Sequence, residues 1–138
     1  MNSFIVEKSV NRVADIEKIF MWLYYTPLGQ TLTKTEKRVL ASYISIYLST
    51  KTVYQTSEIQ EDLVNSYVFG AEASRLVMAD SHIKAGNLQV VKKKLKDAKC
   101  ILTNKDGNHY ISKEVIPTIE NNGDIIIYTT LRFTNETN

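Results

Sequence analysis

The sequence predicts an α+β fold in which several helices precede a β-hairpin. Two observations support this prediction. Apolar residues recur with helical spacing as far as residue 99, and from Cys100 onwards they follow a period of two. The segment 104–108 then contains the pair Asp106-Gly107, which is among the strongest signals for a hairpin turn.

The length and composition predict one globular unit with an uneven charge distribution. A chain of 138 residues suits a single domain, and we expect residues 1–138 to form one. Hydrophobic residues make up 43% of the chain, which is enough for a core. The net charge is only +2, so the total charge does not mark a nucleic-acid binder. Between Lys84 and Lys99, however, there are six lysines and one acid, Asp97.

The first predicted helix spans residues 11–25, with Asn11 as its N-cap and Thr26-Pro27 at its end. Its apolar residues cover almost the whole circumference, and such a helix in a small protein needs a second surface to pack against. Two interpretations of its aromatic side chains therefore stay open, the core and an interface with another protein molecule. These side chains are Phe20, Trp22, Tyr24 and Tyr25.

The clearest helix start lies at Thr33-Lys34-Thr35-Glu36, which has the form of a capping box. The apolar stripe that follows predicts a helix over 34–48, with a polar connection over 49–55. A second capping-box pattern begins at Ser57 and predicts a short helix that ends near residue 65.

Two more helices are expected after a break at 66–70. The first covers 71–79 and is followed by a turn at 80–84. The second covers 86–99, where four apolar residues lie on one narrow arc at 100° per residue. That arc consists of Leu88, Val91, Leu95 and Ala98. The opposite side carries lysines and one apolar residue, Val90.

The remaining segments read as strands. Residues 100–103 and 109–112 should form the hairpin, and a second strand pair is expected within 113–133. Its first strand, 115–120, contains Pro117, which suits an edge position. Its second strand, 125–133, opens with residues 125–128, which are apolar on both faces. That part is either a covered central strand or an edge that pairs with another chain.

This order of elements, helix, helix, turn, helix and hairpin, is that of a winged helix–turn–helix over residues 32–112, with an added N-terminal helix and a C-terminal strand pair. In such a fold one helix enters the major groove, and its N-terminal half contacts base edges. Lysines further along neutralise phosphates. The residues expected to contact DNA are Lys84, Asn87, Gln89, Lys92, Lys93, Lys96 and, at the hairpin tip, Lys105.

Two short patterns lie within the same stretch, Leu32-Thr33-x-x-Glu36-x-x-Val39-Leu40 and, later, Asn87-Leu88 followed by Leu95-Lys96. With these patterns residues 32–112 resemble the winged-helix domains of small phage-encoded proteins. The resemblance covers a little over half of the chain and implies a nucleic-acid-binding ancestry. Lys84 and Ala85 stand where such domains usually carry a Ser or Thr cap.

We expect a non-enzymatic protein that binds double-stranded DNA and acts in transcription control, and that is phage-encoded in origin. The alternative for the lysine run is a solvated helix face. A winged-helix scaffold would then serve as a virion component or as a protein–protein adaptor. Either function is compatible with a homo-oligomer or a larger assembly.

The remaining chemistry-bearing residues predict no catalytic, metal or cofactor site. Cys100 is the only cysteine, and neither of the two histidines has a spacing that pairs it with Cys100. The carboxylates Glu58, Glu61 and Asp62 look like the polar face of a short helix. A single cysteine fits a reducing compartment, and neither a signal peptide nor a membrane span is expected. We therefore expect a cytoplasmic location, in the host cell for a phage regulator, or the virion for a structural component.

Overall fold

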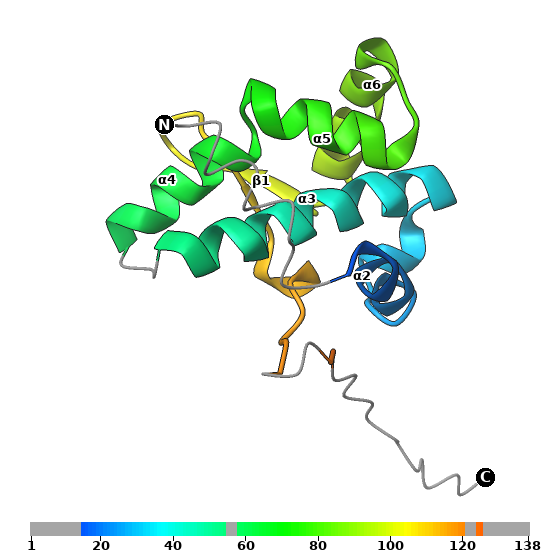
Figure 1. Ribbon diagram of the computed structural model, residues 1–138. Helices are drawn as coiled ribbons and strands as arrows, with labels where there is room; N and C mark the ends of the chain where they lie inside the picture. The colour runs from blue at the N-terminus through cyan, green and yellow to red at the C-terminus, as the bar shows by residue number, and fades with distance from the viewer. Residues whose placement is uncertain (1–14, 55–57, 121–123, 126–138) are drawn as a thin grey trace, which may run out of the picture.

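The computed structural model describes residues 15–54, 58–120 and 124–125. Over these residues the chain forms five α-helices and a two-stranded antiparallel hairpin, so the predicted α+β class is confirmed. The helices are α2 (Ile16–Leu23), α3 (Lys34–Tyr54), α4 (Glu58–Val68), α5 (Ala71–Ser81) and α6 (Ala85–Asp97). In Figure 1, α3 crosses the middle of the molecule, with α4, α5 and α6 on one side and α2 on the other.

Helix α3 begins where the sequence predicts. The Thr33 backbone N–H donates to Glu36 Oε1 at 3.0 Å, and the Glu36 N–H donates to Thr33 Oγ1 at 3.2 Å. This reciprocal capping box satisfies two N–H groups that the helix itself leaves unpaired. Helix α3 contacts all four other described helices. A single hydrophobic cluster around it takes side chains from every helix and from both strands.

Helices α3 and α4 are longer than predicted. Helix α3 runs through most of 49–55, which the sequence suggested was a polar connection, because Ser49 and Thr50 are buried and the Thr50 and Thr52 hydroxyls bond along the helix. Thr50 Oγ1, for example, donates to the Ile46 carbonyl oxygen at 2.7 Å. Helix α4 continues past residue 65 to Val68, whose side chain is fully buried. The predicted Ser57 cap lies outside the described residues.

Helix α2 starts later than expected. Asp15, not Asn11, caps it, because Asp15 Oδ1 accepts the Glu17 N–H at 2.7 Å. Residues 1–14 lie outside the described part of the chain. After α2, Thr26 Oγ1 donates to the Leu23 carbonyl oxygen and accepts the Gly29 N–H. This buried threonine and the short 3₁₀ helix η1 (Gly29–Thr31) carry the chain from α2 into α3.

The hairpin consists of β1 (Ile101–Thr103) and β2 (His109–Ile111), with Thr103 opposite His109. The expected strand over 115–120 does not form. Instead the Ser112 hydroxyl accepts the Glu114 N–H and starts a 3₁₀ turn, η2 (Lys113–Val115). Within the described residues the second strand pair is reduced to one antiparallel bridge, Ile119–Ile125, and residues 126–133 lie outside them.

Candidate nucleic-acid interface

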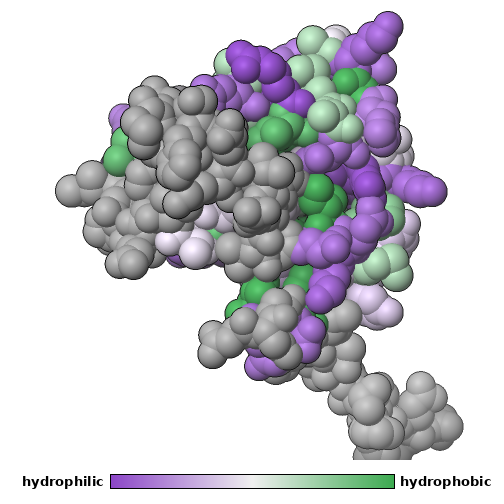
Figure 2. Space-filling model, viewed as in Figure 1, coloured by the Kyte–Doolittle hydropathy of each residue, from purple (hydrophilic) through white to green (hydrophobic). Residues whose placement is uncertain are grey.

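Helix α6 packs through one stripe and leaves the rest of its surface to solvent. Leu88, Val91 and Leu95 are buried, and α6 contacts α3 and β1. Ala98, the fourth residue of the predicted stripe, is half-buried against the same core. The structure therefore supports the predicted packing face. Figure 2 shows hydrophilic residues gathered along the upper edge, over α5 and α6, with apolar residues between them.

The entry to α6 is a tight turn after α5. Helix α5 ends at His82, which adopts the left-handed conformation with φ 56°, and the Ile83 N–H donates to the Met78 carbonyl oxygen at 3.2 Å. Lys84 is the N-cap of α6, with extended backbone and no side-chain capping bond. The turn is therefore limited to residues 82–84, and the first two residues of the predicted 80–84 turn are helical in α5.

The predicted DNA-contacting residues divide between the two flanks of α6. Asn87 and Gln89 are both exposed, but at about 100° per residue they point about 160° apart. The two amides therefore cannot approach the same base pair. Lys93 lies near the outward centre of the helix and is exposed, whereas Lys96 and Lys92 are half-buried on the Gln89 flank.

The Lys92 and Lys96 flank lies beside the hairpin. Burial and then the positive charges of Lys96 and Lys92 lower the pKa of His109 in β2. Burial also lowers the pKa of Lys92, and the charge of Lys96 adds to this effect. No sequence signal points to His109, because α6 and β2 are separated along the chain and no local pattern connects them.

The hairpin tip presents Lys105 to solvent beside Asp106. Its turn is held by Asn104, whose Oδ1 accepts the N–H groups of Asp106 at 2.9 Å and Asn108 at 3.0 Å. Gly107 adopts a φ of 82°, which glycine takes without a steric penalty. The Asp-Gly turn signal is therefore confirmed, and Lys105 stands at the end of a well-bonded loop.

The aromatic residues of α2 do not form one surface. Phe20 is 8% exposed and belongs to the core, and Trp22 is half-buried against it. Tyr24 and Tyr25 are exposed, together with Met21. Lys37 Nζ lies 4.1 Å from the centre of the Tyr24 ring and donates to the Leu32 carbonyl oxygen at 3.0 Å. We call Met21, Tyr24 and Tyr25 the α2 apolar surface.

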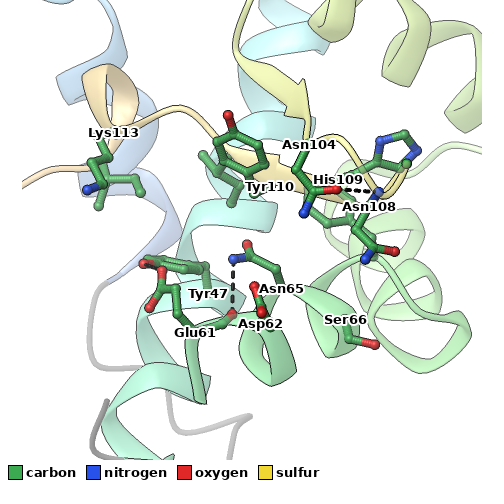
Figure 3. A pocket seen from close by; sticks show the side chains of 14 residues that line it. Tyr47, Glu61, Asp62, Asn65, Ser66, Asn104, Asn108, His109, Tyr110 and Lys113 are labelled. Carbon is green, nitrogen blue, oxygen red and sulfur yellow. Dashed lines mark hydrogen bonds between the residues drawn. The ribbon is translucent and has the colours of Figure 1, made fainter. Parts of the chain in front are cut away.

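A groove of about 530 Å³ runs between α4 and β2, a feature that sequence reasoning missed. The Tyr47 hydroxyl donates to Glu61 Oε1 at its floor, and burial followed by Glu61 raises the pKa of Tyr47. Figure 3 shows Asp62 and Asn65 on the α4 wall facing Tyr110 of β2. Glu61 and Asp62 were interpreted as a plain polar face, since nothing local in the sequence reveals that β2 lies opposite them.

Two observations concern metal-ligating side chains and the single thiol. Within residues 15–54, 58–120 and 124–125, no group of three His, Cys, Asp or Glu side chains could hold a metal ion. Cys100 is buried, and burial, with a smaller contribution from the charge of Glu36, raises its pKa to about 11. A thiol with that pKa is a poor nucleophile near neutral pH.

No protein-family model, curated protein or solved structure matches this chain. Its function must therefore be inferred from its own residues. Among the described helices, none combines the length and the apolar character that a membrane crossing requires.

Proposed function

We propose that this protein binds duplex DNA as a winged helix–turn–helix, with α5 and α6 as the helix–turn–helix and the β1–β2 hairpin as the wing. The observation that carries the proposal is the one-sided packing of α6 beside that hairpin. Leu88, Val91 and Leu95 face the core, so the outward surface carries lysines next to the hairpin. The proposed role is transcription control, without enzymatic activity.

Each exposed residue has a part in this proposal. Gln89 and Lys93 face the major groove, and the Gln89 amide can pair with adenine. Lys84 at the start of α6 and Lys96 further along contact phosphates. Asn87, on the opposite flank, contacts the backbone on its own side of the groove. Lys92 and Lys105, on the side of the surface that the wing occupies, contact phosphates of the adjacent DNA strand.

The test compares two charge reversals of equal size. Lys93→Glu/Lys96→Glu alters the outward face of α6, whereas Lys18→Glu/Lys113→Glu alters α2 and η2, which lie on the other side of α3 (Figure 1). Binding of a random-sequence duplex is measured by fluorescence anisotropy over a range of salt concentrations. Because each phosphate contact contributes roughly 0.9 to the salt slope, we expect the α6 variant to lower that slope by about 2 and the affinity by at least about tenfold.

The control variant should keep both the affinity and the salt slope. The proposal is wrong if the wild-type protein fails to bind duplex DNA at low salt. It is also wrong if Lys18→Glu/Lys113→Glu weakens binding as much as Lys93→Glu/Lys96→Glu does.

The α2 apolar surface favours a second candidate function, a structural or adaptor protein that assembles through α2. Met21 is 57% and Tyr25 58% exposed on neighbouring turns of the chain, although α2 is otherwise packed against α3. Light scattering of the wild type and of Met21→Ser/Tyr25→Ser tests this role. A ring or large assembly that the variant disperses, without duplex binding, favours the structural function. A monomer rules out self-assembly through this surface.

A further inference from the structure

Three basic side chains meet at the junction between α6 and the wing. They are Lys92 and Lys96 of α6 and His109 of β2. His109 lies opposite Thr103 in the hairpin, and its Nδ1 is 3.1 Å from Thr103 Oγ1. Its ring also makes an edge contact with Phe69, at 5.8 Å between ring centres. The imidazole is therefore held by Thr103 and Phe69 on a hairpin whose first strand contacts α6, the helix that carries Lys92 and Lys96.

The charges around this imidazole are positive. Lys96 and Lys92 of α6 both lower its pKa, together with burial. Neither lysine makes an ion pair within the described residues. The carboxylates Glu61 and Asp62 lie on the α4 wall of a groove that His109 also lines, and Figure 3 shows the imidazole turned away from them. The other ionisable groups of the hairpin are Lys105 and Asp106 at its exposed tip and Tyr110, the residue that follows His109 in β2. Lys99 lies just before β1.

Two half-buried lysines that form no ion pair with a carboxylate of the described residues, next to an imidazole, are costly to hold together in the free protein. A bound anion would remove that cost, because it compensates both lysines and stabilises a charged imidazole. The Thr103 hydroxyl can rotate to accept from a protonated His109 or to donate to the anion. The ligand with the matching chemistry is a phosphodiester group, which supplies a full negative charge and two free oxygens.

We infer that Lys92, Lys96 and His109, with the Thr103 hydroxyl, form one phosphodiester site at the α6–wing junction, and that His109 takes up a proton when this site is occupied. The source of the phosphate rests on the proposed function, in which a duplex lies along α6 and the wing. Protonation on binding makes the affinity depend on pH. The affinity is highest below the pKa of His109 in the free protein and falls as the pH rises through its pKa in the complex.

The experiment measures duplex binding between about pH 6 and pH 8 at constant ionic strength, the range in which histidine titrates. His109→Gln removes the titrating group and keeps a side chain that can bond Thr103. The only other histidine, His82, gives the matched control as His82→Asn, since Asn tolerates the left-handed conformation found there. Uptake of one proton limits the gain in affinity to about tenfold per pH unit.

We expect the wild type and His82→Asn to bind several-fold more tightly at the acidic end, and His109→Gln to show a flat profile. The inference is overturned, with DNA binding intact, if His109→Gln keeps the same pH dependence as the wild type. Salt dependence measured on the same samples reports separately on the remaining lysine contacts.

A second measurement distinguishes a general anion site at this junction from a site that binds the phosphates of DNA. Proton NMR of the His109 ring gives its pKa in the free protein and with sodium pyrophosphate or the duplex. A rise in pKa with both ligands supports the site and its use for DNA. A rise with pyrophosphate in a protein that does not bind duplex supports an anion site but contradicts the proposed function. No rise with either ligand overturns the inference.

Discussion

Helices α3 and α6 make opposite use of their polar residues. In α3 the side chains from Val39 to Tyr47 are all buried, and so are Ser49 and Thr50. In α6 only Leu88, Val91 and Leu95 are buried. Small hydroxyl side chains can enter the core because they bond locally or to a neighbour, as Ser42 Oγ does when it donates to Asp80 Oδ2 of α5 at 2.6 Å. The lysines of α6, by contrast, are exposed or half-buried. The comparison teaches that α3 supports the fold while α6 presents a surface.

The largest expected effect is on stability and lies in α3. Ile44→Ala should lower the free energy of unfolding by about 2–5 kcal/mol, because Ile44 is fully buried and the cavity cannot collapse between four helices. Val91→Ala in α6 should cost less, about 1.5 kcal/mol, since it removes fewer methyl groups from a site nearer the surface. Urea denaturation measures both. A larger loss for Val91→Ala would reverse the assigned roles of the two helices.

The next prediction concerns Cys100, where α6 leads into β1. Because burial raises its pKa to about 11, its thiolate population near pH 8 should be about a hundredfold below that of an unperturbed thiol. We therefore expect Ellman's reagent to react at least about a hundredfold more slowly with the native protein than with the urea-unfolded chain. The native rate should rise as the pH increases towards that pKa. Rapid native labelling at pH 8 would mean that this junction opens readily.

Two glycine substitutions compare the α2–α3 connection with the open face of α6. In Gly29→Ala the new Cβ would lie 2.2 Å from the Leu23 carbonyl oxygen, so the backbone must shift, and we expect a loss of about 1–3 kcal/mol. In Gly86→Ala the new Cβ meets nothing within 4 Å, and a helical alanine should add about 0.5–1 kcal/mol. Thermal unfolding of the two variants should shift in opposite directions. Equal shifts would contradict the tight packing around Gly29.

The smallest effect on stability is expected at Val90. This side chain is 58% exposed, so Val90→Lys should change the free energy of unfolding by less than about 0.5 kcal/mol. If α6 faces a duplex, the added charge should strengthen binding and steepen its salt dependence by about one phosphate contact. Val91→Lys is the matched control, since it places a charge in a position that is 8% exposed and should unfold the protein. Unchanged DNA affinity in Val90→Lys would show that the duplex does not contact this face.

Much of the local structure was predictable because its signals lie within a few residues of one another. The Thr33–Glu36 capping box, the Leu88–Leu95 stripe and the Gly107 turn all appear where the sequence indicates. The longer α3 was not predictable, since its hydroxyl residues look like a loop until their burial is known. The strand expected over 115–120 was wrong at its start, where the Ser112 hydroxyl caps the turn η2, and only Ile119 of that segment pairs, with Ile125.

The sequence by itself determined which helices and turns form and that α6 carries a concentration of lysines, because these properties depend on spacing along the chain. Only the tertiary structure decided what those lysines face. It buried Phe20 and brought Lys92 and Lys96 close enough to His109 for their charges to lower its pKa, in addition to the effect of burial. The physical reason is that helix packing sets the rotation of α6 about its axis, and that rotation selects the side chains that meet the hairpin.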